Sequence, residues 1–162
     1  MTSVTVMNGP NLNLLGTRKP EVYGSTTLAD VERMCRQDAE KLGLDVIFLQ
    51  SNHEGQLVDW IHETGAAVKA GDSIGAVYNP GAHTHYSYAI RDAIEAATLP
   101  VVELHISNVH AREEFRHHSV ISPLARGIIV GFGVQGYSMA INGLYELHEA
   151  EVKKNLKPGV RT

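Results

Sequence analysis

The chain has 162 residues, a length that suits one domain with a single hydrophobic core. Hydrophobic residues make up 43% and charged residues 20% of it, which is ordinary for a water-soluble globular protein. The formal net charge of −4, without a long basic run, argues against nucleic acid as a partner, and no apolar stretch is long enough to span a membrane.

The cysteine content and the first residues predict a cytoplasmic protein. The single Cys35 cannot form an internal disulfide, which fits a reducing compartment. The N-terminal residues lack the charged and apolar regions of a secretory signal peptide.

In chain order, the first predicted element is a short buried strand at residues 4–7, followed by an unusually long polar segment. Residues 8–24 number about seventeen, whereas connections in a compact domain are normally a few residues long. Glycine and proline fix the path of this segment, and its Asn, Arg and Tyr side chains offer hydrogen bonds and charge. It is either a surface loop or an active-site lid at the carboxyl end of the strand, where open α/β sheets bind ligands.

A helix is predicted next. Thr27 can cap it, with Asp30 as the capping-box partner, and apolar residues recur at helical spacing up to Gly43, which ends it. Cys35 lies on the apolar stripe, so we expect core packing rather than a reactive thiol.

The second predicted strand covers residues 44–49, and a further helix follows it. Ser51 and Asn52 are good candidates for the residue that caps this helix. His53 and Glu54 could form a metal pair, but an acid at a helix start more often complements the helix dipole.

The third predicted strand covers residues 73–78 and leads into a polar turn at 79–87 and then a helix. His83 and His85 in this turn could bind a metal, cap the helix or hydrogen-bond a substrate, and no carboxylate or cysteine completes a metal site. His85 and Asp92 are seven residues apart, about two helical turns, so they can share a face.

The fourth predicted strand covers residues 99–104, and a short helical piece follows at 110–118. The fifth predicted strand covers residues 127–130, and a final helix covers 137–149. A G-x-G-x-x-G pattern at Gly131–Gly136 follows the last strand, so we favour close packing of the helix on the sheet over dinucleotide binding. We expect one catalytic domain over residues 1–150 and a charged, frayed tail over 151–162.

Five strands separated by helices predict a three-layer α/β fold with a parallel sheet, and the simplest arrangement is flavodoxin-like with strand order 2-1-3-4-5. Polar residues follow the strands at the carboxyl edge of this sheet, where they would meet. They are Asn11, Arg18, Tyr23, Asn79, His85, His105 and Ser107.

Four motifs in this order resemble the type II 3-dehydroquinate dehydratases: NGPNLNLLGTRKPEVYG, SNHEG, NPGAHTHYS followed by IRDA, and VELHISNVHAREEFRHHS. The resemblance covers nearly the whole chain. It implies a flavodoxin-like subunit, trimers assembled into a dodecamer, no cofactor, and anti elimination of water from 3-dehydroquinate through an enolate, in aromatic amino-acid biosynthesis or quinate catabolism.

The resemblance also implies roles for individual residues. Tyr23 would be the base, Arg18 its activator and His105 the general acid, while Asn11 would hold the water that stabilises the enolate. The substrate-binding residues would be Asn79, His85 and Arg116 for the ring hydroxyls, Ile106 and Ser107 for the carboxylate, and Asp92 in the site of a neighbouring subunit. Lys19 and His83 depart from the residue types expected at their positions. These departures bear on the motion of the lid and on the affinity for substrate, not on the reaction itself.

The residue types suit the chemistry. A tyrosine with a reference pKa of about 10 is a poor base at neutral pH, and a guanidinium nearby would favour the phenolate. A dehydratase can instead use a lysine Schiff base, but no lysine here lies in an apolar strand that would lower its pKa.

The competing hypothesis is a binding module, either a flavodoxin-like FMN carrier or a phosphate-responsive receiver. An FMN carrier needs a Ser/Thr-rich phosphate loop after the first strand, where this chain has only Thr17. A receiver needs clustered acids at the strand ends, where this chain has Asn and His.

Overall fold

The computed structural model describes residues 1–17 and 19–156, and at residues 22 and 23 it describes the backbone alone. Within them, the strands are β1 (Ser3–Asn8), β2 (Asp45–Gln50), β3 (Ser73–Asn79), β4 (Val101–His105) and β5 (Gly127–Val130). The α-helices are α1 (Pro20–Tyr23), α2 (Leu28–Lys41), α3 (Glu54–Ala70), α4 (Tyr88–Ala97) and α5 (Gln135–Asn155). The short 3-10 helices are η1 (Leu12–Leu14), η2 (Gly81–His85), η3 (Val109–Ala111), η4 (Glu114–His117) and η5 (Ser122–Leu124). None of the described helices is both long and apolar enough to cross a lipid bilayer.

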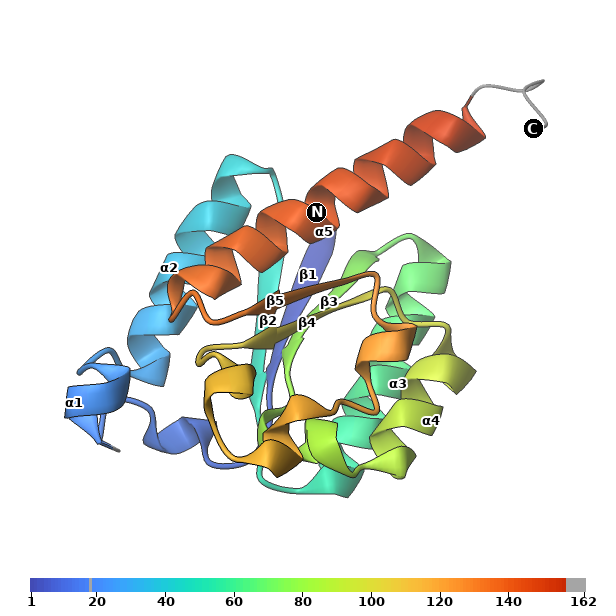
Figure 1. Cartoon of the computed structure of the whole chain (residues 1–162). Coiled ribbons are helices and arrows are strands. Elements are labelled where there is room, and N and C mark those ends of the chain that lie inside the picture. Colours follow the sequence, from blue (N-terminus) through green and yellow to red (C-terminus); the bar gives the residue numbers. More distant parts are fainter. Residues whose placement is uncertain (18, 157–162) are drawn as a thin grey trace.

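The strands form one parallel sheet in the order β2-β1-β3-β4-β5 (Figure 1). This is the predicted flavodoxin-like order, and the prediction is confirmed. The register brings Asn8 level with Gln50 on one side and Asn79 on the other, so the carboxyl ends of the central strands meet at one edge. That edge includes the point between β1 and β3 where the order in which the chain adds strands to the sheet reverses.

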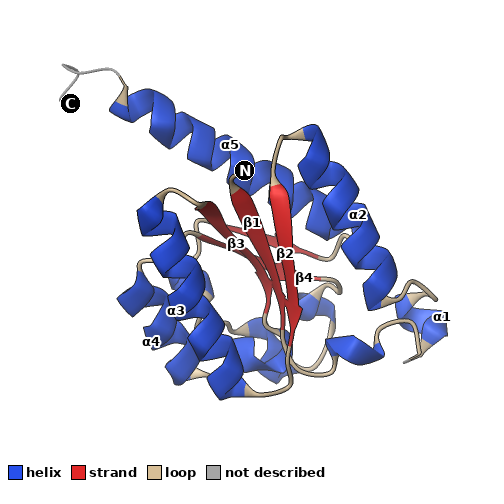
Figure 2. Ribbon diagram, turned by 180° about the vertical axis from the view of Figure 1, so that it is seen from behind, coloured by secondary structure: helices blue, strands red, loops and turns tan. Residues whose placement is uncertain are grey.

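Helices cover both faces of the sheet, as seen from opposite sides in Figures 1 and 2. On one face, Val4 and Val6 of β1 pack against α2 and α5. On the other, Met7 of the same strand joins the core formed with α3 and α4. Side chains alternate between the two cores because successive residues of a strand point to opposite faces. Cys35 is fully buried in the first core, which confirms its packing role, and burial raises the pKa of its thiol to about 12.

The helix ends only partly match the predictions. Thr27 and Asp30 form the predicted capping box of α2, and Gly43 follows that helix with a left-handed φ of 73°. The predicted caps of α3 are wrong: His53 is its N-cap residue, without a side-chain cap. The Ser51 hydroxyl instead accepts the His53 N–H (2.9 Å), and Asn52 bonds toward the segment after β1.

Gly136 confirms the close-packing interpretation of the glycine pattern. A Cβ atom placed on it would lie 2.6 Å from Leu104 Cδ1, so any other residue there would have to displace this buried side chain of β4. The helix itself continues to Asn155, beyond the predicted end at 149, and Figure 1 shows its last turns extending past the sheet.

Two segments hold more structure than predicted. The long segment after β1 contains η1 and α1, and Figure 1 shows α1 standing to the side of the sheet, near the start of α2. The segment after β4 contains η3 and η4 in place of one helical piece.

Candidate active site

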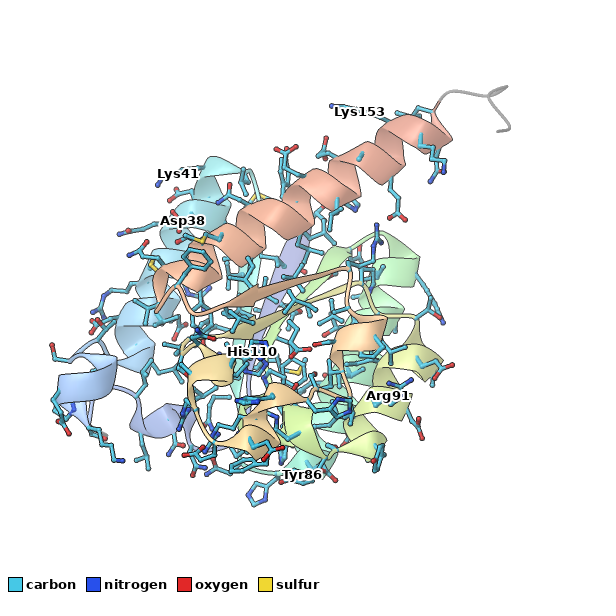
Figure 3. The ribbon with its side chains drawn as sticks, in the orientation of Figure 1. Asp38, Lys41, Tyr86, Arg91, His110 and Lys153 are labelled. Carbon is cyan, nitrogen blue, oxygen red and sulfur yellow. The ribbon has the colours of Figure 1, made fainter. Side chains whose placement is uncertain are left out.

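A cavity of about 200 Å³ lies at the carboxyl edge of the sheet, between the segments that follow β1, β3 and β4. Figure 3 labels Tyr86 and His110 near this edge, where many side chains gather. The residues that line the cavity are Pro10, Asn11, Leu12, Leu15, Asn79, Gly81, Ala82, His85, His105, Ile106, Ser107, Val109, Arg112 and Arg116. Seven predicted site residues are among them: Asn11, Asn79, His85, His105, Ile106, Ser107 and Arg116.

His105 ends β4 and is 7% exposed. Its Nε2 atom lies 2.6 Å from Oε2 of Glu103, two residues back on the same strand. Because a carboxylate only accepts, Nε2 carries a hydrogen and donates it. The other ring nitrogen, Nδ1, is then free to bind a second group, as an acceptor in the neutral ring or a donor in the protonated one.

Glu103 is a buried carboxylate, 1% exposed, held by hydrogen bonds. Thr84 donates to Oε2 (2.9 Å), and Ser119 and Ser122 donate to Oε1 (3.0 and 2.8 Å). Burial acts to raise the pKa of Glu103, but the bonds from His105, Ser122 and Thr84 outweigh it and hold the pKa below the usual value. Glu103 therefore gives His105 an anionic partner.

His85, at the end of η2, stacks beside His105 with ring centroids 6.5 Å apart. Its Nδ1 atom lies 2.8 Å from the His118 carbonyl oxygen, so Nδ1 must be the donor. Burial lowers the pKa of His85, and the nearby His105 and Arg116 lower it further. The neutral ring therefore offers Nε2 as a hydrogen-bond acceptor.

Asn79 is fixed by a buried hydrogen-bond chain. Its Oδ1 accepts from the Gly81 N–H (3.2 Å), and its Nδ2 donates to the Tyr137 hydroxyl (3.1 Å). Tyr137 in turn donates to Asn8 Oδ1 (2.6 Å), and Asn8 Nδ2 donates to the Leu49 carbonyl (3.1 Å). The side-chain amides of Asn79 and Asn8 thus each have a defined orientation. Asn79 keeps a second N–H and a second lone pair for a ligand.

Asn11 is held by its backbone. It adopts a left-handed conformation (φ 69°), and its N–H donates to Asn52 Oδ1 (3.0 Å). Asn52 also accepts from Gln50 Nε2 (3.2 Å), so the turn after β2 supports the segment after β1.

Two arginines supply positive charge to the cavity. Arg112 Nη1 donates to Ser107 Oγ (3.3 Å), next to the backbone of Ile106. Arg116 pairs with Glu113 and lies over the Phe115 ring, 4.6 Å from its centroid. Guanidinium groups beside a hydroxyl and backbone amides suit an anionic ligand.

Three predicted residues are not placed in this cavity. Arg18 lies outside the described residues, and so does the side chain of Tyr23, whose backbone ends α1. Asp92 is exposed on α4 and does not line the cavity. It cannot share a helical face with His85, because α4 begins only at Tyr88 and His85 belongs to η2.

Lys19 and His83, the two positions with unexpected residue types, do not line the cavity. Lys19 is exposed, with a left-handed φ of 43°. His83 is 5% exposed, packs edge-on against Tyr86, and its Nδ1 has no hydrogen-bond partner among the described residues. Burial lowers the pKa of His83, so this ring is neutral.

Sequence reasoning missed Glu103 and Arg112. The sequence did contain a signal for Glu103, which is the only acid within the apolar strand 99–104. A glutamate is rarely buried without a partner, so this position predicts a paired carboxylate. Arg112 follows Ser107 by five residues in a polar segment, and only the folded turn brings the two together. The described part of the chain holds no group of three or more His, Cys, Asp or Glu side chains that could bind a metal.

Comparison with known proteins gives one family. Residues 2–145 match the family model described as Dehydroquinase class II. The 3-dehydroquinate dehydratase of Variovorax paradoxus is 64% identical over 144 residues, which are 89% of this chain and 99% of that protein. The 3-dehydroquinate dehydratase of a Marinomonas species is 63% identical, over 89% of this chain and 96% of that protein.

Solved structures agree. The crystal structure of a type II dehydroquinase from Butyrivibrio crossotus matches with a TM-score of 0.82 and 46% identity, over 88% of this chain and 97% of that one. That of the type II dehydroquinase from Propionibacterium acnes matches with a TM-score of 0.82 and 42% identity, over 90% and 97% of the two chains.

Proposed function

This chain belongs to the class II dehydroquinase family, and we propose that it dehydrates 3-dehydroquinate to 3-dehydroshikimate by anti elimination through an enolate. The observation that carries the proposal is the cavity at the carboxyl edge, which combines a histidine paired with a buried carboxylate, a fixed amide and two arginines. This set offers an acid, hydrogen-bonding groups for a polyhydroxylated ring and a site for its carboxylate.

We assign proton removal to Tyr23, which loses its own proton to act as the base. Arg18, five residues earlier, would favour the phenolate by its positive charge, and lowering the tyrosine pKa by one unit is worth about 1.4 kcal/mol. Asn11 would hold the water that stabilises the enolate, and its position in the cavity supports this role.

We assign proton donation to His105. Loss of the hydroxyl group requires a proton, and a protonated His105 can deliver it from Nδ1 while Nε2 stays bonded to Glu103. The bond to Glu103 fixes the ring and leaves Nδ1 as the nitrogen that would give up the proton.

We assign substrate binding to the remaining lining residues. Asn79, His85 and Arg116 would hold the ring hydroxyls, with the neutral His85 accepting at Nε2. Ile106 and Ser107 would bind the carboxylate, and Arg112, bonded to Ser107, would add charge there. We expect no cofactor to take part.

The proposed site also involves a second subunit. We propose a dodecamer built of trimers, in which Asp92 reaches the site of a neighbour. Its exposure on α4, away from the cavity of its own subunit, supports this role. We further propose a catalytic domain over residues 1–150 and a charged tail from 151, whose first residues continue α5. We also propose a cytoplasmic enzyme of aromatic amino-acid biosynthesis or quinate catabolism.

The test is to add 3-dehydroquinate to the purified chain and follow the absorbance of the conjugated enone product. Absence of turnover at any pH would refute the proposed activity. Arg18→Gln then tests the activation of Tyr23, with Lys19→Gln, the adjacent cation, as its matched control. We expect Arg18→Gln to reduce turnover more than affinity and to move the rising limb of the pH profile to higher pH. An unmoved limb with a large loss of affinity would instead make Arg18 a carboxylate ligand.

A further inference from the structure

We propose that Thr84, Ser119 and Ser122 form a hydroxyl cage that keeps Glu103 an anion, so that the proton between Glu103 and His105 stays on the histidine. The cage would make these three positioning residues for the acid of the reaction. This inference rests on the proposed function for its kinetic consequence, but the location of the proton can be measured without substrate.

Glu103 depends on hydrogen bonds from side chains because almost none of its surface is exposed. It is 1% exposed, and a carboxylate has about four lone-pair positions. Four side chains donate to it: His105 and Thr84 to Oε2, and Ser119 and Ser122 to Oε1. Three of the four donors are neutral hydroxyls, which stabilise the ionised form.

The direction of these bonds follows from the backbone. The N–H groups of Ile121 and Ser122 both donate to Ser119 Oγ (3.1 and 3.0 Å), which occupies its two lone pairs. The Ser119 hydroxyl can therefore only donate. The Thr84 hydroxyl, 2.7 Å from Ser119 Oγ, cannot donate to an oxygen that is already filled, so its hydrogen goes to Glu103.

Ser119 then shares its hydrogen between Glu103 Oε1 and Thr84 Oγ1, while Ser122 donates to Oε1 alone. A proton on Glu103 Oε1 would face Ser119, which has no lone pair left to receive it, and a proton on Oε2 would have to point at His105 Nε2. In the second case the hydroxyls would donate to a neutral acid, which is a weaker acceptor than a carboxylate. The geometry thus matches the ionised carboxylate.

The cage matters because Nε2 of His105 and Oε2 of Glu103 are 2.6 Å apart, close enough for a proton to move between them. If the Nε2–H bond broke and an Oε2–H bond formed, the pair would become a neutral imidazole and a neutral carboxylic acid. The imidazole would still carry hydrogen on Nδ1 but would be a far weaker acid than the imidazolium. Of the other groups around the pair, the cation Arg116 lines the same cavity as His105 and would favour this transfer by repelling an imidazolium. His85 is neutral, and burial raises the pKa of Tyr78, which keeps its hydroxyl uncharged.

The test removes one hydroxyl at a time. Thr84→Val keeps the shape of the side chain, Thr84→Ser keeps the hydroxyl, and Ser122→Ala removes the unshared donor at a partly exposed position. Ser119 is left intact because its oxygen also holds two backbone groups. The matched control is Ser138→Ala, since Ser138 also donates to a carboxylate, that of Asp38, but at the contact of α5 with α2.

The first readout is steady-state turnover of 3-dehydroquinate. We expect Thr84→Val and Ser122→Ala each to lower kcat about tenfold to a hundredfold, the effect of a lost hydrogen bond to a charged group, with KM changed much less. Thr84→Ser should recover most of the loss, and Ser138→Ala should leave kcat unchanged. A KM effect alone, or an equal effect of the control, would overturn the proposal.

The second readout is NMR of the ligand-free protein, with ¹⁵N-labelled histidine and ¹³C-labelled glutamate, at a pH where the wild-type His105 ring is protonated. In Thr84→Val and Ser122→Ala we expect His105 to move toward the neutral ring with hydrogen on Nδ1 and the Glu103 carboxyl signal toward the protonated form. Unchanged signals in folded variants would overturn the proposal even if the wild-type chain turns over no substrate. If Thr84→Val does not fold, Ser122→Ala decides the outcome.

Discussion

Replacing Tyr137 with phenylalanine should test the buried hydrogen-bond chain beneath the cavity. The hydroxyl bridges Asn79 Nδ2 and Asn8 Oδ1 at 3.1 and 2.6 Å, and all three side chains are at most 3% exposed. Loss of the hydroxyl leaves one donor and one acceptor unpaired in the interior, each at a cost of about 1–3 kcal/mol. We therefore expect the free energy of unfolding to fall by about 2–6 kcal/mol, and Tm by about 4–24 °C.

The assay is thermal and urea unfolding of both proteins, followed by circular dichroism. Tyr145→Phe is the matched control, because Tyr145 lies on the same helix and is only partly buried against the same core. If Asn79 binds the substrate, Tyr137→Phe should also raise KM, and combining it with Asn79→Ala should add little to the effect of Asn79→Ala alone. A Tm within about 2 °C of wild type would refute the reasoning, since two unpaired buried groups should destabilise the protein by more than that shift allows.

Four further outcomes are expected. Tyr23→Phe should abolish turnover while folding and substrate binding stay nearly intact, because only the basic oxygen is lost. His105→Ala should slow turnover about a hundredfold to ten-thousandfold, as expected for a lost proton donor. The pKa of Glu103 is lowered in the folded state, so its ionisation stabilises the protein at neutral pH, and wild type should lose this stability as the pH falls below about 4.5. Glu103→Gln cannot ionise, so its free energy of unfolding should lack this part of the pH dependence. Gly9→Ala should abolish activity, because the new Cβ would lie 2.8 Å from the carbonyl carbon of Pro80 and push the segments after β1 and β3 apart.

Each of these outcomes has a direct contradiction. Turnover of Tyr23→Phe within a few-fold of wild type would exclude Tyr23 as the base, and a His105→Ala variant that loses affinity but keeps kcat would make His105 a binding residue. Urea titrations at several pH values would contradict the Glu103 assignment if wild type and Glu103→Gln changed in parallel. For Gly9→Ala the control is Gly143→Ala, at a position in α5 where a Cβ meets no atom within 4 Å, and equal activity of the two variants would contradict the steric argument.

The sequence was sufficient for the fold because the information is local and periodic. Apolar strands alternate with helical repeats, and the capping box at Thr27 and Asp30 lies within four residues. The start of α3 was predicted wrongly for the opposite reason. Asn52 has the side chain of a good N-cap residue, but its Oδ1 accepts from the N–H of Asn11, a residue 41 positions away. A contact of that range competes with local capping and leaves no mark in the sequence around the helix.

The two histidines of the cavity show the same limit at the level of chemistry. His85 and His105 have identical side chains, stacked 6.5 Å apart, and the sequence marks both as polar residues near strand ends. Their partners separate them: His85 donates to the neutral carbonyl of His118, 33 residues later, whereas His105 donates to the carboxylate of Glu103. Burial lowers the pKa of His85 by more than the bond to the His118 carbonyl raises it, so that ring is neutral and suited to accept a hydrogen bond. The carboxylate holds the Nε2–H of the other ring, which leaves Nδ1 as the nitrogen that can exchange a proton. The division of labour between binding and acid catalysis therefore resides in the atoms behind the two rings, and those atoms come together only when the segments after β3 and β4 fold against each other.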